Sequence, residues 1–251
     1  YYLLSQLCVL VSFYFVWKLA EELFENNLLS LISVLLLEGI YFFNFTTPEF
    51  NVNICELPFW SLSVYYFWKS FKNDKLKDWC LLGLFSALGF LSKYLFIYLL
   101  LSISFFLIYR SLKKKNFKKN YLIPVLIFIA ILSPHFYWLL KNNFITIFYG
   151  LNRTGLETSN NIDHLINPVI FIIKQFFILT PFLFMLFILI KKIKIKFSYK
   201  DENFLFLVAI NIIPILLIFL TSFFTGATIR TMWMTPFYLF LGIFLVYIFK
   251  R

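Results

Sequence analysis

Residues 79–109, WCLLGLFSALGFLSKYLFIYLLLSISFFLIY, form the most informative apolar segment of this chain. A helix that crosses a bilayer needs about 20 residues at roughly 1.5 Å per residue, so this segment is too long for one crossing. Basic residues flank it on both sides, within 69–78 and 110–119. If both flanks lie on the same side of a membrane, the segment must fold as two short helices that meet near Ser92–Tyr94. Its first half carries small residues that allow close helix packing, namely Gly83, Ala87 and Gly89.

Positive charge is distributed unevenly around the apolar segments. Most of the 23 Lys and Arg residues fall in gaps on one side, at Lys18, 69–77, 110–119, 191–200 and 250–251. The opposite side keeps Lys93, Lys141, Arg153 and Arg230, and Lys174 lies inside an apolar run. By the positive-inside rule, the crowded side faces the cytoplasm. The cations lie at helix ends rather than on one basic face, so the net charge of +11 indicates contact with anionic lipid headgroups and not with nucleic acid.

The composition excludes a soluble domain. Hydrophobic residues make up 61% of the chain, with 36 Phe and 15 Tyr, whereas a globular chain is only about 45–50% apolar. The long apolar runs lack the period-two alternation of a barrel, so the prediction is an all-α, polytopic transmembrane helical bundle that forms a single domain over residues 1–251. About nine crossings are expected, near 1–19, 28–45, 54–68, 79–92, 94–109, 121–139, 165–190, 203–223 and 234–249. The three cysteines lack metal or disulfide spacing and are interpreted as packing residues.

The chain begins at Tyr1, directly inside an apolar stretch. We therefore expect it to be a fragment that lacks an N-terminal helix and the external loop after it.

Inserting an ionisable residue at bilayer depth costs about 2.5–3.5 kcal/mol on insertion scales, so such residues are candidates for a functional role. Glu38 falls in the middle of the second predicted helix, where a functional role and a protonated structural role both stay open. Lys174 can snorkel towards an interface along its own stem. The external side carries a sparse set of ionisable groups: Glu49, Glu56, Lys93, His135, Lys141, Arg153, Glu157, Asp163, His164 and Arg230.

Lys93 and Arg230 break the charge rule and suggest a bound anion, although an interfacial snorkelling role is open for both. Glu49 follows Pro48 in a turn and can act as a base, a hydroxyl acceptor, a metal ligand or a solvated charge. His135 has no companion at metal-ligand spacing, so no metal site is assigned. No Gly-rich phosphate loop or nucleotide-binding fold is present in the sequence, so an activated substrate is expected to arrive in the membrane.

Several motifs occur in an order that resembles one family. They are Thr46-Thr-Pro-Glu49, the tryptophan-led Gly83 to Lys93-Tyr94 segment, Ser133-Pro-His135-Phe-Tyr-Trp138 and Phe148-Tyr-Gly-Leu-Asn-Arg153. Together they resemble the dolichyl-phosphate-mannose protein mannosyltransferase and aminoarabinose transferase group of the glycosyltransferase C superfamily. Each motif is short, and their order across most of the chain carries the likeness.

The resemblance implies inverting transfer of a sugar from a polyprenyl-phosphate-sugar donor to a protein, lipid or polysaccharide acceptor. It places the reaction on the extracytoplasmic face of a cell membrane, with a bacterial inner membrane expected. Glu49 matches the family's second acidic station, and the main catalytic aspartate is expected upstream of Tyr1, so this fragment alone is expected to be inactive. No cofactor is assigned, and a divalent cation stays open. The expected substrate-binding residues are Lys93, Tyr94, His135, Arg153 and Arg230.

Other functions are compatible with a membrane bundle that carries ionisable residues. A secondary transporter or a lipid-linked sugar flippase is the main alternative, but the matched half-repeats typical of many transporters are not found in the sequence. A lipid-carrier-dependent polymerase or ligase of surface polysaccharide and a purely structural membrane subunit are the others.

Overall fold

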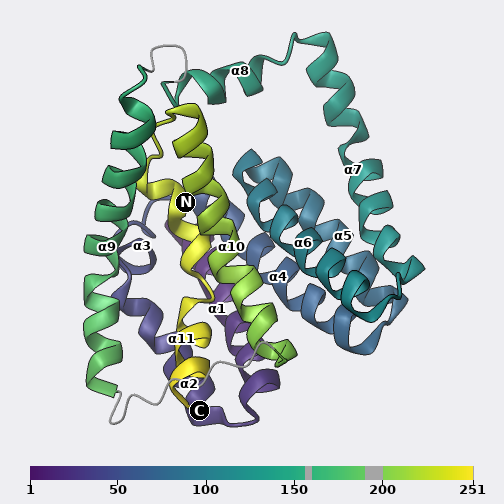
Figure 1. The fold of residues 1–251 in the computed structure, drawn as a ribbon, viewed down its shortest axis with the longest axis vertical. Coiled ribbons are helices and arrows are strands. Elements are labelled where there is room, and N and C mark those ends of the chain that lie inside the picture. The colour runs from purple at the N-terminus through teal and green to yellow at the C-terminus, as the bar shows by residue number, and fades with distance from the viewer. Residues whose placement is uncertain (156–159, 190–199, 251) are drawn as a thin grey trace.

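The computed structural model describes residues 1–155, 160–189 and 200–250, and every regular element within them is helical (Figure 1). The prediction of an all-α bundle is therefore confirmed. Glu157, the basic segment 191–196 and Arg251, all named above, lie outside the described residues.

The elements follow one another with short connections. Asn26 and Asn51 cap two of the helices, because each side chain accepts hydrogen bonds from the first free backbone N–H groups. The bounds are α1 Tyr2–Phe24, α2 Asn27–Leu35, η1 Leu36–Gly39, α3 Tyr41–Asn44, α4 Val52–Asn73, α5 Leu76–Ser92, η2 Tyr94–Phe96, α6 Ile97–Lys114, η3 Lys119–Tyr121, α7 Leu122–Lys141, α8 Ile145–Asn152, α9 Asp163–Leu189, α10 Glu202–Thr225, η5 Thr231–Tyr238 and α11 Leu241–Lys250.

The predicted number of about nine crossings is wrong. Within the described residues, five helices are long and apolar enough to cross a membrane, or up to six if η5 and α11, bent by 53°, form one span. The five are Tyr2–Phe24, Tyr94–Lys114, Lys119–Lys141, Asp163–Leu189 and Glu202–Thr225.

The excess comes from apolar segments that fold into short, broken or polar helices. The segment 28–45 breaks after Leu35 into a 3-10 turn and a four-residue helix, so Glu38 lies exposed at a break and not in the middle of a helix. The segment 79–92 becomes α5, which has only 17 residues. The segment 54–68 belongs to α4, which is long enough but carries too many polar residues to pass as a span.

The break expected near Ser92–Tyr94 is confirmed. Helix α5 ends at Ser92, Lys93 has an extended backbone, and η2 leads directly into α6. Gly83 also packs as expected, because a Cβ there would lie 2.8 Å from the backbone of Pro124 in α7. Gly89 instead makes room for the ring of Phe96 just beyond the break.

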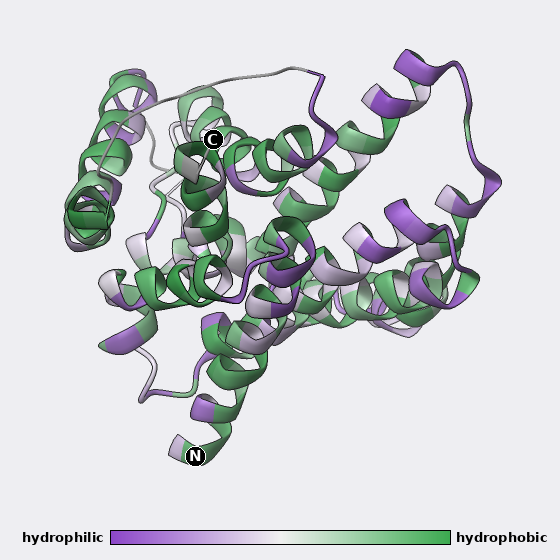
Figure 2. Cartoon of the chain, turned by 90° about the horizontal axis from the view of Figure 1, so that it is seen from below, coloured by the Kyte–Doolittle hydropathy of each residue, from purple (hydrophilic) through white to green (hydrophobic). Residues whose placement is uncertain are grey.

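Large aromatic side chains fill the centre of the bundle. Trp60 of α4 contacts Phe96 and Phe237, and Phe67 contacts Phe206 of α10, with ring centroids 4.9–5.6 Å apart. The bodies of the helices are mostly hydrophobic, whereas hydrophilic residues gather at helix ends and connections (Figure 2). This pattern suits a bundle whose middle faces lipid.

The bundle has two chemically different ends. At the first, which we call the basic end, ion pairs join α1 to α4, the α4–α5 turn to the segment before η3, and α6 to α10; these pairs are Lys69–Glu22, Lys118–Asp74 and Arg110–Glu202. At the other, which we call the cavity end, lie Lys93, the α7–α8 turn, α8 and the α10–η5 connection. Helix α8 lies across this end between α7 and α9 (Figure 1). The structure thus separates the predicted basic loops from the exceptions to the charge rule.

Candidate functional site

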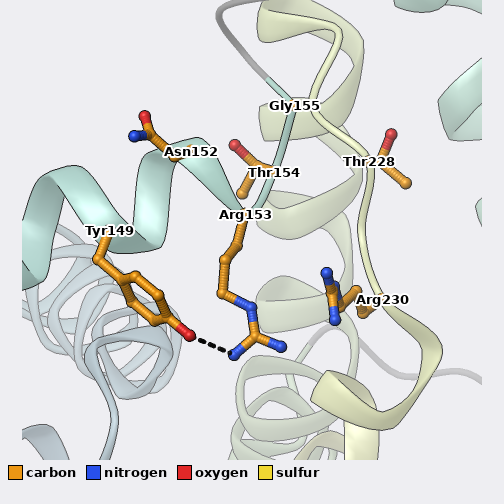
Figure 3. A pocket seen from close by; sticks show the side chains of 7 residues that line it. All are labelled: Tyr149, Asn152, Arg153, Thr154, Gly155, Thr228 and Arg230. Carbon is orange, nitrogen blue, oxygen red and sulfur yellow. Dashed lines mark hydrogen bonds between the residues drawn. The ribbon is translucent and has the colours of Figure 1, made fainter.

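A cavity of about 480 Å³ opens at the cavity end. Two connections that are distant in sequence build it, and a backbone hydrogen bond of 2.9 Å from the Thr228 N–H to the Thr154 carbonyl joins them. Gly226, at φ 69°, ends α10 in a left-handed conformation and directs the second connection towards the first. The lining residues are Tyr149, Asn152, Arg153, Thr154, Gly155, Thr228 and Arg230 (Figure 3).

Two guanidinium groups dominate the charge of this cavity. Arg153 donates a hydrogen bond of 3.2 Å to the Tyr149 hydroxyl and lies 5.5 Å from the centre of its ring. Arg230 extends towards the same space from the opposite connection (Figure 3). Both side chains belong to exposed residues, and neither forms an ion pair with an acid in the part of the chain that the structure describes. Two unneutralised guanidiniums on one cavity form a suitable binding site for a phosphate group.

Lys93 supplies a third cation at this end. Its ammonium donates a hydrogen bond of 2.6 Å to Asn53 Oδ1 and lies 5.7 Å from the centre of the Trp233 ring. Burial lowers the pKa of Lys93 to about 8; the Glu56 carboxylate acts to raise it, and the positive charge of Arg153 acts to lower it further. Lys93 is therefore within electrostatic reach of the cavity and close to losing its proton at physiological pH.

Glu56 is the acidic group behind Lys93. It is fully buried, and neither carboxylate oxygen has a hydrogen-bond partner in the described structure. Asn53 and Glu56 are three residues apart on α4, so their side chains share one face of the helix. Sequence reasoning placed Glu56 only among the external charges and missed Asn53. The positions of Asn53 and Glu56 after the N-cap Asn51 predict that both lie on one face of the helix. This spacing does not predict which other element that face contacts.

Tyr94 and His135 meet in a separate network next to this group. The Tyr94 hydroxyl lies 2.8 Å from His135 Nε2 and 2.7 Å from the Thr146 hydroxyl, and His135 stacks on Trp138. The network connects η2 with α7 and α8. It therefore holds α8, which has no buried residue, against the bundle.

Glu49 lies apart from the cavity. It is exposed in the turn before α4, where its main-chain carbonyl accepts a hydrogen bond of 3.2 Å from the Asn51 side chain. It does not line the cavity. The structure thus brings Arg153 and Arg230 together on the cavity, whereas Lys93 and Glu49 are not among the lining residues. The roles of all these residues stay predictions. In the described ranges, no group of three or more His, Cys, Asp or Glu residues is placed to hold a metal ion.

One of three comparisons, the one with models of protein families, gave a match. A family model described as dolichyl-phosphate-mannose-protein mannosyltransferase matches residues 1–138, more than half of the chain. The match includes Glu49, Lys93, Tyr94 and His135 and ends before α8. Searches of curated proteins and of solved structures found no match. The family match agrees with the resemblance in the sequence motifs, and we conclude that the chain belongs to the dolichyl-phosphate-mannose-protein mannosyltransferase family.

Proposed function

We propose that this membrane glycosyltransferase moves a sugar from a polyprenyl-phosphate-sugar donor to a protein, lipid or polysaccharide acceptor on the extracytoplasmic face of the cell membrane. Family membership supports glycosyl transfer in general. The sidedness rests on the positive-inside rule, since the basic end carries the cationic loops and the cavity lies at the opposite end.

The observation that carries the proposal is the pairing of Arg153 and Arg230 on one cavity without an acidic partner among the described residues. When the sugar leaves the donor, negative charge grows on the polyprenyl phosphate. Cations fixed in advance near this charge stabilise the transition state without reorganising. Guanidinium groups suit the task because they bind phosphate oxygens in pairs. The cavity volume of about 480 Å³ also falls within the usual range for small-ligand sites, roughly 300–1,000 Å³.

The lipid part of the donor has an apolar route to the cavity. Helix α8 exposes Ile145, Phe148 and Leu151, and Tyr149 of the same helix lines the cavity. A polyprenyl chain in the bilayer can lie along this surface while its phosphate reaches Arg153. Glu49, in the turn before α4, is proposed as the acidic group that positions the acceptor.

The test is a transfer assay in membranes that contain the full-length protein, with a polyprenyl-phosphate sugar labelled in the sugar. We expect Arg153→Ala and Arg230→Ala each to lower kcat/KM by about 10- to 100-fold, the scale of one lost charge-assisted phosphate contact. Lys113→Ala is the matched control, because Lys113 contacts Tyr109 at the basic end much as Arg153 contacts Tyr149. The control should change the rate by less than about twofold.

Two results would overturn the proposal. One is that the arginine variants and the Lys113 control behave alike. The other is that labelled donor crosses the bilayer without sugar transfer, which would favour the transporter or flippase alternative.

A further inference from the structure

The connection between α10 and η5, residues 226–230, carries two of the residues that line the cavity. Its side chains alternate between two environments. Ala227 and Ile229 are buried. Thr228 and Arg230 are exposed and line the cavity (Figure 3). Arg230 has an extended backbone, in which successive side chains point to opposite sides. The backbone of this connection therefore determines in which direction the Arg230 guanidinium extends.

Hydrogen bonds from outside the connection hold its backbone at three successive residues. The Asn167 side-chain amide of α9 donates a hydrogen bond of 2.7 Å to the Gly226 carbonyl. The buried Ser222 hydroxyl of α10 donates one of 2.7 Å to the Ala227 carbonyl. The Thr228 N–H donates the bond of 2.9 Å to the connection that follows α8. Three parts of the chain thus hold a segment that has no regular secondary structure of its own.

Asn167 is the partner that ties this connection to a neighbouring helix. It lies on α9 and does not line the cavity. His164, three residues earlier on the same face of α9, has its Nδ1 atom 3.1 Å from the Phe223 carbonyl oxygen. Both contacts are to carbonyls at the end of α10, where the helix itself no longer supplies N–H partners. The start of α9 therefore fixes the point from which the connection leaves α10.

We infer that Asn167 is a positioning residue for Arg230: by holding the Gly226 carbonyl, it fixes the connection so that the guanidinium extends into the cavity that Arg153 also lines. The ligand is the donor phosphate, and on this point the inference rests on the proposed function. Arg230 is exposed, so its place in the cavity depends on the backbone that carries it. A displacement of about 1 Å in a group placed in advance for the transition state can cost up to about 100-fold in rate. Asn167 acts through this backbone and does not contact the phosphate.

The first experiment measures the backbone of the connection without any donor. Hydrogen exchange followed by mass spectrometry reports the amides of residues 224–232, among them the Thr228 N–H, in the full-length protein purified in detergent. We expect Asn167→Leu to speed exchange there by about fivefold, the effect of one lost hydrogen bond. Asn167→Gln keeps an amide and should recover part of the protection. Asn120→Leu is the matched control, because it removes an amide that holds Asp74 at the basic end, and it should leave these amides unchanged.

The second experiment measures kcat/KM for the donor in the same variants. Asn167→Leu should lower kcat/KM by about tenfold, whereas Asn120→Leu should change it by less than about twofold. When Arg230→Ala is already present, Asn167→Leu should cause almost no further loss, because the guanidinium that it positions is absent. A residue that only stabilises the fold would lower kcat/KM by the same factor with and without Arg230.

The outcomes separate this inference from the proposed function. Exchange that is unchanged by Asn167→Leu would overturn the inference, and so would equal losses of kcat/KM with and without Arg230. If Arg230→Ala leaves kcat/KM unaltered while Asn167→Leu still speeds exchange, the proposed phosphate site is refuted and the hold of Asn167 on the connection is upheld. If Asn167→Leu does not fold, Asn167→Ala removes the same hydrogen bond and replaces it in both experiments.

Discussion

The cations at the two ends of the bundle have different kinds of partner. At the basic end, Arg110 and Lys114 meet Glu202, and Lys118 lies 2.8 Å from Asp74. At the cavity end, Lys93 is bonded to a neutral amide and Arg153 to a neutral hydroxyl. The basic end thus neutralises positive charge within the protein, whereas the cavity end retains it.

This difference separates structural charge from charge available to a ligand. A cation that already has a carboxylate partner must break that pair before it binds phosphate, which costs free energy. Arg153 and Arg230 have no such partner among the described residues, so their full charge is available to an incoming anion. The contrast can be tested by giving the cavity end an acid or by removing one from the basic end.

The largest effect is expected when an acidic partner for the arginines is introduced at the cavity end. Thr228→Glu places a carboxylate on the cavity lining to which Arg153 and Arg230 also belong. It should lower kcat/KM for donor by about 10²- to 10³-fold, because it neutralises the guanidiniums and repels the phosphate. Thr228→Gln is the control of the same size and should lose less than about tenfold. Equal losses in both variants would attribute the effect to volume rather than charge.

The converse change, Glu202→Gln, acts on the basic end. It leaves the almost fully buried Arg110 without its carboxylate partner. We expect a loss of about 1–3 kcal/mol in the free energy of unfolding, at the lower side of the range for a broken buried pair because Glu202 is partly exposed. Thermal unfolding in detergent measures this loss, while kcat/KM of the protein that remains folded should be unchanged. A selective loss of transfer with full stability would contradict the division between the ends.

A smaller effect, on donor binding, is expected when the pH is raised. Since the pKa of Lys93 is lowered to about 8, the ammonium is present below that pH and is lost above it. Binding of the donor, whose phosphodiester keeps its charge over this range, should weaken by up to about tenfold between pH 7 and 9. The lowered pKa of Lys93 by itself makes the folded state more stable as pH rises through this window, and thermal unfolding measured at each pH separates loss of binding from loss of the fold. Isothermal titration across the series tests this, and Lys93→Met should bind with no such dependence.

The smallest effect is expected at the turn between α4 and α5. Burial opposes ionisation of Asp74, but hydrogen bonds from Lys118, Trp79 and Asn120 outweigh it and lower its pKa. A carboxyl group with a lowered pKa stabilises the fold above its ordinary pKa, and this stability is lost as pH falls through the lowered value. Because the pair is partly exposed, Asp74→Asn should cost less than about 1 kcal/mol near neutral pH and nothing at strongly acidic pH. Chemical unfolding at both pH values provides the measurement.

Local sequence properties predicted the helical class, the break at Lys93 and the separation of charge. The number of crossings could not be counted in the same way, because hydropathy does not distinguish a span from a broken helix. Near Glu38, for example, a Cβ on Gly39 would lie 2.7 Å from the backbone of Phe182, so the break accommodates a close approach of α9.

Only part of the candidate site could be predicted from the sequence. Lys93, Arg153 and Arg230 stood out because they violate the positive-inside rule. The partnership of Lys93 with Asn53 and Glu56 depends on which face of α4 turns towards the end of α5. That choice is made by tertiary packing around Trp60, and no local pattern encodes it.

The backbone hydrogen bond between Thr154 and Thr228 has a consequence for biosynthesis. Because it joins connections on either side of α9 and α10, the ribosome must complete the chain well past the family-matched portion before the cavity can close. Folding of the cavity end therefore depends on α9 and α10, which follow the family-matched residues in the chain.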